Sequence, residues 1–429
     1  MSAAPLRLGL AGLGTVGIGV VKIIQGHADL IAARAGREVQ ITAVSARDRT
    51  KNRDADLSNY IWEDDPVVLA SYPDIDVFIE VMGGHEGPAR AATEAAIAAG
   101  KDVVTANKAL LAHHGQALAE AAEAIGRVIR FEAAVAGGIP VIKTLTEGLA
   151  GNGMKRVMGV MNGTCNYILT RMQSAGLPYD AVFEEARQLG YLEADPTLDV
   201  GGIDAGHKLS LLAAIAFGTR VSFDAVELEG IGNVSIDDIR LAEDMGYRIK
   251  LLGVAQMTGR GLEQRMTPCL VPADSPLGQL QGGTNMVVLE GDSVGQIVMR
   301  GPGAGMGPTA SAIMADVIDL ARGIRTPTFG IPARSLKPAT PARAATPAPY
   351  YLRMTLIDKP GALAKIATCL GEAGISIDQM RQYGHVGVHA TVLIVTHKAA
   401  PGDIAHATTR FAATGVLVGA PVAIRIEEV

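Results

Sequence analysis

Residues 6–21 read LRLGLAGLGTVGIGVV. The first part of this stretch is an apolar, strand-like run, and it leads directly into three glycines, Gly12, Gly14 and Gly17. In a GxGxxG turn the first glycine permits a tight bend, the second lets the backbone approach a pyrophosphate, and the third lets a helix pack on the strand. The phosphates then face the N-terminus of that helix. A dinucleotide site is therefore predicted, with a structural glycine-rich turn as the alternative. Its residues are Gly12, Leu13, Gly14, Thr15, Val16 and Gly17.

The residues after this turn alternate short apolar strands with alanine-rich helices. This alternation predicts the α/β class, with a doubly wound parallel sheet of Rossmann type over residues 1–150. The expected strands are 6–11, 40–45, 76–81, 102–105 and 128–131, and the expected helices are 88–99 and 110–124. A late segment, about 301–325 with a helix at 310–322, is expected to pack back on this domain and complete it.

Residues 151–300 are expected to form an α+β domain for substrate binding and dimerisation. Its expected strands are 156–161, 286–289 and 296–299, and its expected helices are 168–173, 181–189 and 204–217. Residues 326–349 hold six prolines, which predicts a semi-extended linker that few contacts cross. Residues 350–429 follow a βαββαβ order and are expected to be a separate domain, with strands at 350–358, 376–381, 388–396 and 422–426 and helices at 362–372 and 403–413.

Charge and cysteine content exclude several classes of protein. The formal net charge of the 429 residues is −6, so no overall basic field draws the chain to nucleic acid. Three scattered cysteines make neither a disulfide framework nor a zinc site, as is typical of the reducing cytoplasm. The uncharged run 8–21 resembles the core of a secretory signal, but glycines interrupt it and no small-residue cleavage site follows. We expect a soluble cytoplasmic protein with a small-molecule partner and no contact with membranes or nucleic acid.

The end of the second strand bears on cofactor choice. An acidic residue there would accept the ribose hydroxyls of NAD, but this chain has Ser45 and Arg47. A hydroxyl and a guanidinium suit the 2′-phosphate of NADP, so NADP is favoured as the cofactor. Asp48 keeps NAD open, and the arginine could also be a solvated loop charge.

Two segments carry the residue types that a proton transfer needs. Asn107 and Lys108 follow a buried strand at the edge where open α/β sheets bind ligands, although a lysine there could be merely solvated. Asp204 and Lys208 lie four residues apart at the start of a nearly apolar helix, and so on one face of it. The alternative is a routine helix salt bridge. A buried pair of this kind often marks a site, and a lysine can then serve as a proton donor in carbonyl reduction.

Six stretches, in order and with matching spacing, resemble the homoserine dehydrogenase family over almost the whole chain. They are GLGTVG (12–17), VTANKALLA (104–112), FEAAVAGGIPVI (131–142), GVMNGTCNYIL (159–169), GYLEADPTLDVGGIDAGHK (190–208) and GPGAGMGPTASAIMADV (301–317). The resemblance implies the reversible NAD(P)H-dependent reduction of L-aspartate 4-semialdehyde to L-homoserine, a step in threonine, methionine and isoleucine biosynthesis.

The same resemblance implies roles for individual residues. Lys208 matches the proton donor, Lys108 lies at the reacting centre, and Asp204 supports both lysines. The residues implied to bind the amino-acid end of the substrate are Glu193, Asp199, Gly163, Thr164 and Tyr191. Those implied at the cofactor, beyond the glycine turn, are Arg47, Asn107, Lys108 and Gly305. A monovalent cation, sodium or potassium, is implied at Glu132 and the backbone carbonyls of Val135, Gly137 and Ile139.

The tail, from YYLRMTLIDKPGAL at 350–363 onward, resembles an ACT regulatory domain. In that family the glycine matching Gly361 begins the first helix at an amino-acid site, commonly between paired domains. The resemblance implies feedback regulation, with threonine as the effector, and a homodimer or homotetramer. A dimerisation module without a ligand is the alternative.

Three rival functions remain open from the sequence. Cys165 beside a nicotinamide would suggest a phosphorylating aldehyde dehydrogenase, although a lone buried cysteine is usually inert. Another Rossmann dehydrogenase for a different amino-acid aldehyde is a second possibility. A catalytically silent amino-acid sensor is the third, and the joint presence of Lys108, Asp204 and Lys208 argues against it.

Overall fold

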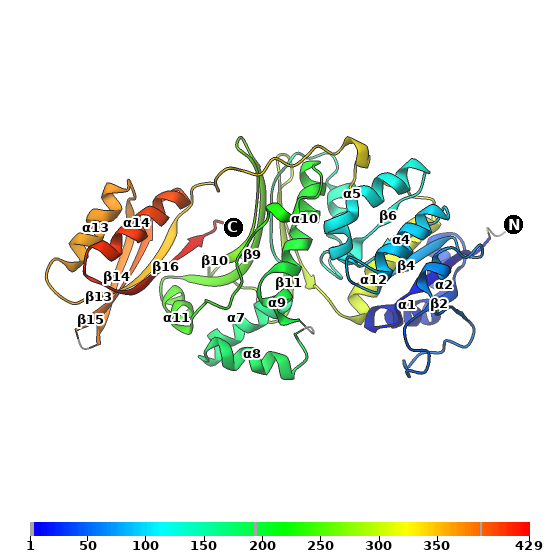
Figure 1. Cartoon of the computed structure of the whole chain (residues 1–429), viewed down its shortest axis with the longest axis horizontal. Helices are drawn as coiled ribbons and strands as arrows, with labels where there is room; N and C mark the ends of the chain where they lie inside the picture. The colour runs from blue at the N-terminus through cyan, green and yellow to red at the C-terminus, as the bar shows by residue number, and fades with distance from the viewer. Residues whose placement is uncertain (1–3, 193–194, 387) are drawn as a thin grey trace.

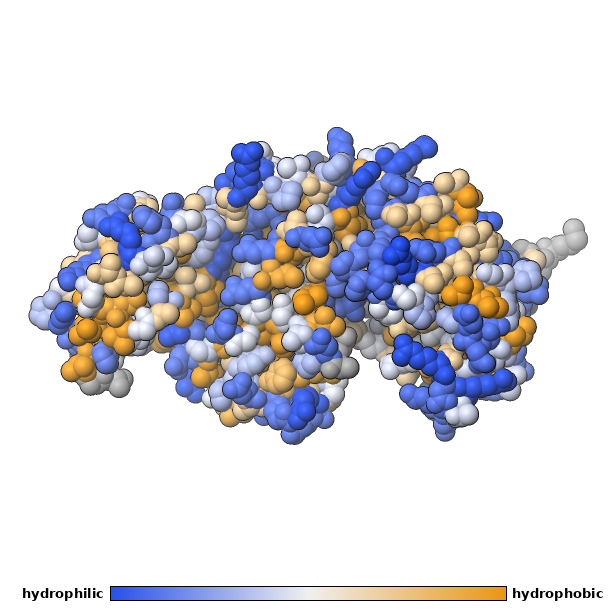
Figure 2. Space-filling model, in the orientation of Figure 1, coloured by the Kyte–Doolittle hydropathy of each residue, from blue (hydrophilic) through white to orange (hydrophobic). Residues whose placement is uncertain are grey.

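The computed structural model describes residues 4–192, 195–386 and 388–429. It is elongated, with the N-terminal domain at one end, the C-terminal βαββαβ unit at the other, and a mixed α+β region between them (Figure 1). In the space-filling view, hydrophobic and hydrophilic residues are interspersed, and a notch separates the N-terminal lobe from the middle lobe (Figure 2).

The N-terminal domain is built on a six-stranded parallel sheet in the order β3-β2-β1-β4-β5-β6. Its strands are β1 (Leu6–Ala11), β2 (Val39–Ser45), β3 (Ile61–Trp62), β4 (Val77–Glu80), β5 (Asp102–Thr105) and β6 (Ile129–Arg130). Its helices are α1 (Thr15–Gly26), α2 (Ala28–Ala35), α3 (Pro66–Ala70), α4 (Pro88–Ala98), α5 (Lys108–Ala124) and the returning α12 (Met306–Ala321). The predicted Rossmann-like sheet is confirmed, and its strand order reverses at β1, where such sheets bind ligands.

The late helix α12 packs directly against α1, as the sequence predicted. A Cβ atom at Gly19 would lie 2.8 Å from the carbonyl oxygen of Met306, so the glycine permits this close approach. Within the described residues no single helix is long and apolar enough to cross a membrane. Helices α1 and α2 reach that length and apolarity only together, and they are bent by 85°. The apolar face of α1 is buried in the core of the domain.

The middle and C-terminal parts share one ten-stranded sheet, in the order β12-β11-β7-β9-β10-β16-β13-β15-β14, with β8 beside β10. The middle strands are β7 (Met154–Val160), β8 (Glu227–Leu228), β9 (Tyr247–Thr258), β10 (Gly261–Pro272), β11 (Thr284–Gly291) and β12 (Gly295–Pro302). The middle helices are α6 (Val141–Lys143), α7 (Gly163–Ala175), α8 (Tyr179–Gln188), α9 (Pro196–Val200), α10 (Ile203–Phe217) and α11 (Ile236–Asp244). Short 3₁₀ or π turns are η1 (Glu132–Ala134), η2 (Thr144–Gly148), η3 (Phe223–Ala225) and η4 (Ala333–Ser335).

The C-terminal unit has the predicted βαββαβ order and its own apolar core. Its elements are β13 (Tyr350–Ile357), α13 (Ala362–Glu372), β14 (Ile377–Val386), β15 (His389–Thr396), α14 (Pro401–Ala413) and β16 (Leu417–Ile426). Its sheet is nevertheless continuous with the middle sheet, because β16 pairs with β10 at Cys269–Arg425 and Leu270–Ile426. The unit therefore has its own core, as expected of a domain, but its sheet joins that of the middle domain at this seam.

The proline-rich segment before the tail is extended, as predicted, but it is held along the middle domain. Arg220 N donates to the carbonyl of Lys337 at 2.7 Å, and Leu262 N donates to that of Thr340 at 2.8 Å. The expectation that few contacts cross this segment is wrong. An extended chain keeps its backbone carbonyls available, and the neighbouring N–H groups use them.

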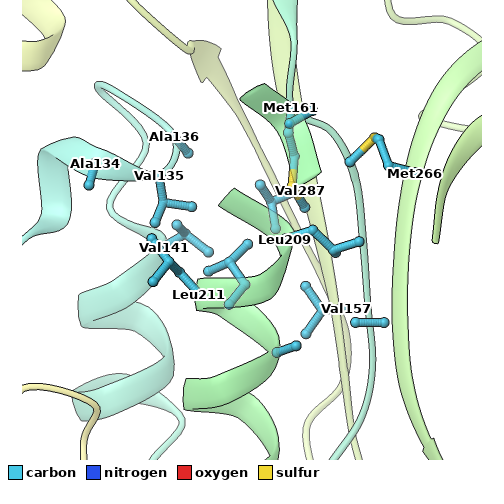
Figure 3. Close-up of a cluster of buried hydrophobic side chains, with 14 of the residues drawn as sticks. Ala134, Val135, Ala136, Val141, Val157, Met161, Leu209, Leu211, Met266 and Val287 are labelled. Atoms are coloured by element: carbon cyan, nitrogen blue, oxygen red, sulfur yellow. The ribbon is translucent and has the colours of Figure 1, made fainter. Parts of the chain in front are cut away.

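An apolar cluster joins the first two domains (Figure 3). Leu209 and Leu211 of α10 and Val287 of β11 are fully buried there. Ala134, Val135, Ala136 and Val141, from the end of the first domain, pack in the same cluster. This cluster packs α10 against the end of the first domain.

Candidate active site

The glycine turn lies between β1 and α1, at the carboxyl edge of the parallel sheet. Gly12 has φ +106°, and a Cβ there would lie 2.6 Å from the carbonyl oxygen of Val81. A Cβ at Gly17 would lie 1.9 Å from the carbonyl oxygen of Gly12. At Gly14 a Cβ would meet no described atom within 4 Å, and no described side chain caps α1. The turn thus leaves open space and helix N–H groups where a pyrophosphate would bind, so these residues fit a dinucleotide.

Two arginines, Arg47 and Arg53, follow the end of β2. Ser45 is buried, and its carbonyl accepts from Gly12 N at 2.9 Å. Arg47 is exposed. Arg53 donates from Nε to the carbonyl of Leu13 at 3.2 Å, in the glycine turn itself. Arg53 escaped the sequence analysis because it lies eight residues beyond the strand, although the basic run 47–53 was a usable signal.

Asn107 and Lys108 connect β5 to α5. The Asn107 side chain accepts from Leu110 N at 3.0 Å and donates to the carbonyl of Gly84 at 2.7 Å, so it caps α5 and fixes the loop after β4. Beneath it, the hydroxyl of Thr105 donates to the fully buried carboxylate of Glu80 at 2.7 Å. Lys108 is the first residue of α5, and these bonds set its position.

Asp204 joins the two lysines that the sequence singled out. Its Oδ1 lies 2.9 Å from Nζ of Lys108, and its Oδ2 lies 2.7 Å from Nζ of Lys208. Lys208 also donates to the carbonyl of Met161 at 2.9 Å. Burial by itself would raise the pKa of Asp204, but the charges and hydrogen bonds of the two ammonium groups outweigh it and hold that pKa well below its usual range. A charged carboxylate therefore binds both lysines at neutral pH.

The buried carboxylate of Asp199, on α9, lies beside this group. Asn162 donates from Nδ2 to Asp199 Oδ1 at 2.9 Å, and its own Oδ1 caps α7 by accepting from Cys165 N at 2.8 Å. The Cys165 thiol donates to the carbonyl of Asp199 at 3.3 Å, and burial raises the pKa of this thiol. Cys165 is thus a buried packing residue, and this environment argues against a nucleophilic role for it.

The other described residues expected at the substrate end are Gly163, Thr164 and Tyr191, and they line the same cavity as Asp199 and Asp204. Thr164 donates from its hydroxyl to the carbonyl of Tyr191 at 2.9 Å, and the Tyr191 ring stacks on Tyr167 with 4.4 Å between centroids. A Cβ at Gly163 would lie 2.5 Å from the carbonyl oxygen of Gly283, so this position requires glycine. Glu193 lies outside the described residues.

A cavity of about 540 Å³ brings most of these groups together. Its lining includes Val16, Lys108, Gly163, Thr164, Tyr191, Asp199, Asp204, Lys208 and Gly305. A second cavity, of about 560 Å³, lies on the other side of Lys108 and Asp204 and is lined by the loop 81–85 and by Asn107. Arg47, in contrast, lines neither cavity. The two cavities form the space between the first and second domains that a dinucleotide and a small substrate would share.

Two histidines in the wall of the second cavity were not singled out from the sequence. The His207 ring lies 5.5 Å from that of His113 and 4.2 Å from that of Phe223, centroid to centroid. Burial, and then the neighbouring His113, lower the pKa of His207 to about 4. The His207 ring is therefore uncharged at neutral pH. The signal was present, since His207 lies between Asp204 and Lys208 in the quoted stretch.

Glu132 lies at the base of the loop that leads from η1 to α6. Its carboxylate accepts from Ile142 N at 2.9 Å and from Lys143 N at 2.8 Å. Burial, and then the nearby Asp316, raise the pKa of Glu132 to about 7. The described residues contain no group of three His, Cys, Asp or Glu side chains placed to hold a metal ion. Any cation here would depend on backbone oxygens, as at Val135, Gly137 and Ile139.

In the C-terminal unit, Gly361 precedes α13 with φ +85°. A Cβ there would meet no described atom within 4 Å, so the turn opens to free space. This is the position at which the sequence predicted an amino-acid site.

Comparison with known protein families matches three parts of the chain. Residues 12–132 match "Homoserine dehydrogenase, NAD binding domain", residues 140–318 match "Homoserine dehydrogenase", and residues 350–415 match "ACT domain". Among curated proteins, the homoserine dehydrogenase of Neisseria gonorrhoeae is 43% identical and 92% of each chain is covered. That of Pseudomonas aeruginosa is 42% identical over 99% of each chain.

Solved structures agree with these matches. A homoserine dehydrogenase from Thiobacillus denitrificans superposes with a TM-score of 0.93 and 40% identity, over 99% of each chain. A hyperthermophilic archaeal homoserine dehydrogenase in complex with NADPH superposes with a TM-score of 0.63 and 25% identity, covering 74% of this chain and 97% of that one.

Proposed function

Because this chain belongs to the homoserine dehydrogenase family, we propose that Lys208 supplies the proton and that Asp204 positions it. The family has an NAD-binding domain and, in this chain, an ACT domain. Its reaction is the reversible reduction of L-aspartate 4-semialdehyde to L-homoserine. The observation that carries the proposal is the double contact of Asp204 with Lys108 and Lys208 at the wall of the cavity that Gly305 also lines.

Proton transfer follows from the contacts of Lys208. An ammonium group has three N–H donors, and here Asp204 and the carbonyl of Met161 accept two of them. The third donor is available to the aldehyde oxygen, which gains a proton as the carbonyl is reduced. When bound, NAD(P)H supplies the hydride to the carbonyl carbon. Lys108 stabilises the negative charge that develops on this oxygen, and Asp204 keeps both ammonium groups in place.

The amino-acid end of the substrate is assigned to the opposite part of the cavity. The buried carboxylate of Asp199, oriented by Asn162, binds the substrate ammonium, together with Glu193. The N-terminal turn of α7 at Gly163 and Thr164 binds the carboxylate, since helix N–H groups favour anions. Tyr191, stacked on Tyr167, lines the cavity beside them. This arrangement favours an amino-acid aldehyde over a simple aldehyde.

For the cofactor, we propose NADP as the preferred form, with NAD also accepted. The solved archaeal relative contains NADPH. Arg47 is assigned to the 2′-phosphate, and Arg53, which contacts the glycine turn, is assigned beside it. Asn107, which fixes the loop after β4, and Gly305, which lines the cavity, are assigned to the nicotinamide end.

A monovalent cation, sodium or potassium, is assigned to Glu132 and the carbonyls of Val135, Gly137 and Ile139. An all-oxygen set suits a hard cation, and the burial of Glu132 makes a positive charge there favourable. The test is the melting temperature in sodium, potassium and tetramethylammonium chloride at equal ionic strength. Sodium or potassium should raise it for the native enzyme and not for Glu132→Gln; equal effects on both would contradict the assignment.

We assign the ACT domain to feedback regulation by threonine at Gly361, and the working enzyme to a cytoplasmic homodimer or homotetramer. The experiment for the whole proposal follows oxidation of NADPH and of NADH with L-aspartate 4-semialdehyde, in parallel, for the native enzyme. Turnover with this substrate and a preference for NADPH are expected. Turnover only with other amino-acid aldehydes would overturn the assignment of the substrate. Equal use of both cofactors would overturn the proposed preference for NADPH.

A further inference from the structure

Lys250, on β9, carries a buried amino group that the proposed mechanism does not use. The residue is 4% exposed, and its Nζ donates to Asn166 Oδ1 at 3.0 Å and to the carbonyl of Leu280. Burial, and then the charge of Arg248, lower the pKa of Lys250 to about 8, so the group is still mostly protonated at pH 7. Strand β9 therefore buries a positive charge whose hydrogen bonds go to neutral groups.

Other buried cations of this chain have a counter-charge. Lys208 is paired with Asp204 at 2.7 Å, and Arg130 with Asp319 at 3.0 Å. Among the described residues, no carboxylate forms an ion pair with Lys250. Burying a charge without a counter-charge is costly, and neutral acceptors satisfy its hydrogen bonds without cancelling the charge. A cation kept under these conditions favours an anion that binds nearby.

The contacts of Lys250 lead to the substrate cavity. Asn166 belongs to the start of α7, and its Nδ2 donates to the carbonyl of Gly282 at 2.7 Å. Lys250 and Asn166 thus tie residues 280–282 to α7. The next residue, Gly283, lines the substrate cavity together with the first two residues of α7. Lys250 therefore lies behind the wall to which the substrate carboxylate is assigned.

The charge of Lys250 acts in the same direction as the N-terminus of α7. The first turn of a helix carries a partial positive charge, and Gly163 and Thr164 place this turn on the cavity wall. Solvent screens a buried charge less than an exposed one, so a buried charge acts over several ångströms without touching its partner. The full charge of Lys250 and the partial charge of the helix therefore both attract an anion at this wall.

We propose that Lys250 determines the preference of this enzyme for substrates with an α-carboxylate, through the positive charge that it holds behind the first turn of α7. Lys250 is a positioning residue, because it acts through the wall that Gly163, Thr164 and Gly283 form. The inference rests on the proposed function, in which this wall binds the substrate carboxylate. If Lys250 only tied residues 280–282 to α7, the tie through Asn166 would matter as much as the charge.

The test measures dissociation constants by isothermal titration calorimetry on the full-length enzyme saturated with NADPH. The probes are L-homoserine, which NADPH does not reduce, and 3-amino-1-propanol, which is L-homoserine without its carboxylate. Lys250→Met should weaken the binding of L-homoserine about tenfold, the effect of a unit charge roughly 12 Å away at an effective dielectric of about 20. It should leave the binding of 3-amino-1-propanol unchanged. Asn166→Ala, which removes the tie and keeps the charge, should weaken the binding of L-homoserine less.

The same variants give a kinetic result that does not depend on the amino alcohol. Lys250→Met should raise the KM for L-aspartate 4-semialdehyde by a similar factor and keep kcat, because it removes binding that substrate and transition state share. Lys155→Met, at an exposed lysine of the neighbouring strand β7, is the matched control and should change neither constant. Lys250→Gln, which also lacks the charge, serves if Lys250→Met does not fold.

Three results would overturn the proposal. They are equal weakening of L-homoserine and 3-amino-1-propanol in Lys250→Met, native binding of both compounds by that variant, and an equal loss of L-homoserine binding in Asn166→Ala. The proposed function fails separately, if the native enzyme does not turn over L-aspartate 4-semialdehyde with either cofactor.

Discussion

The carboxylate of Asp204 lies 2.7 Å from the ammonium of Lys208, one helical turn further along α10, and both side chains are about nine-tenths buried. The same carboxylate reaches Lys108, on a helix of the other domain. The carboxylate of Asp204 thus pairs with two ammonium groups, one from each of the first two domains. Without it, the two ammonium groups would repel each other at the reacting centre.

Asp204→Asn should therefore damage both stability and turnover. Removing one partner of a buried ion pair costs about 3–5 kcal/mol, because the remaining charges are left uncompensated. We expect a clear fall in the free energy of unfolding and a fall in kcat. Asp237→Asn, at an exposed aspartate of α11, is the control and should change neither. Native-like denaturant unfolding of Asp204→Asn would show that the pair is not structurally important.

Both arginines near β2 should affect the choice between NADPH and NADH. Arg47→Glu is expected to raise the KM for NADPH much more than that for NADH, because it removes a guanidinium from the 2′-phosphate and adds a repelling carboxylate. Arg53→Ala should do the same and also loosen the glycine turn, since Arg53 binds the carbonyl of Leu13. Arg34→Glu, exposed on α2, should leave both constants unchanged. Equal losses for NADPH and NADH in Arg47→Glu would mean that Arg47 does not meet the phosphate.

The pKa of His207 predicts a particular acid sensitivity. Its folded value, about 4, lies below the usual value of 6.5. Between these values the unfolded chain binds more protons, so the native state loses stability as pH falls from about 6.5 towards 4 and keeps it in full above 6.5. Chemical unfolding across that range should show a shallower decline for His207→Gln than for the native enzyme. His406→Gln, exposed on α14, should decline as the native enzyme does; an equal decline in all three would refute the assignment.

Regulation is tested best by substitution at Gly361. Threonine should inhibit the native enzyme, and Gly361→Leu should weaken that inhibition while basal kcat stays unchanged. The reason is that φ +85° strains any larger residue and its side chain would occupy the open space of the turn. Gly371→Leu, at an exposed glycine within α13, is the control for a bulky residue in this unit. If millimolar threonine neither binds nor inhibits the native enzyme, the unit is an assembly module or binds another amino acid.

The structure argues against testing regulation by cutting the chain near Pro338. The preceding and following residues bind the middle domain, and Glu427 of the tail neutralises Arg265 of β10. Removing the tail would leave Arg265 buried with fewer partners and would open the edge of β10. A truncated enzyme could therefore lose activity for reasons unrelated to the effector.

Short-range patterns in the sequence predicted much of this fold. The glycine turn, the parallel strands and the i,i+4 spacing of Asp204 and Lys208 are short-range features, and each was visible in the sequence. The contact of Lys108 with Asp204 spans 96 residues, so spacing could not reveal it; the family resemblance implied the association. The β9–β10 hairpin was missed because β10 reads GLEQRMTPCLVP, without the alternation of a half-buried strand.

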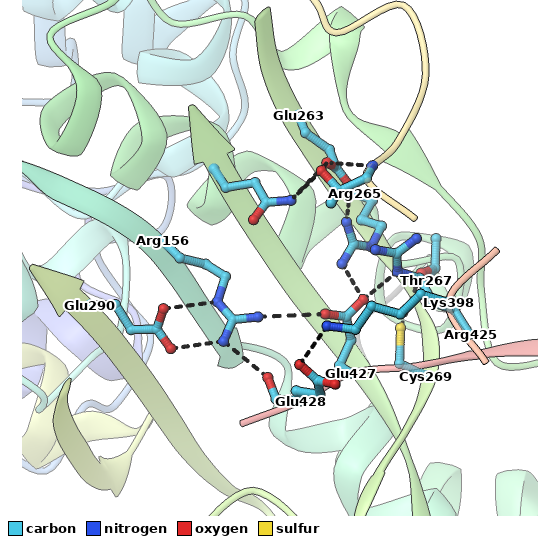
Figure 4. Close-up of polar contacts among 12 residues, drawn as sticks. Arg156, Glu263, Arg265, Thr267, Cys269, Glu290, Lys398, Arg425, Glu427 and Glu428 are labelled. Atoms are coloured by element: carbon cyan, nitrogen blue, oxygen red, sulfur yellow. Dashed lines mark hydrogen bonds and ion pairs between the residues drawn. The ribbon is translucent and has the colours of Figure 1, made fainter. Parts of the chain in front are cut away.

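The charged residues that break the strand pattern of β10 also stabilise the join between the middle sheet and the C-terminal sheet. Arg265 is buried in mid-strand because it binds both Glu263, on the same strand, and Glu427, which directly follows the last strand of the chain (Figure 4). No local rule predicts that a charged strand segment will find its partners 162 residues away. For the same reason the continuity of the two sheets became visible only in three dimensions.

The most direct test of Lys208 as the proton donor is the turnover of Lys208→Ala with L-aspartate 4-semialdehyde and NADPH. We predict a fall in kcat of about 10²- to 10⁴-fold, as is typical when a general acid is removed, with the Kd for NADPH unchanged. Lys365→Ala, at an exposed lysine of α13, should keep native turnover, and Lys108→Ala should also lose most of it. Near-native turnover of Lys208→Ala, in an enzyme that still binds NADPH, would contradict the assignment of Lys208 as the proton donor.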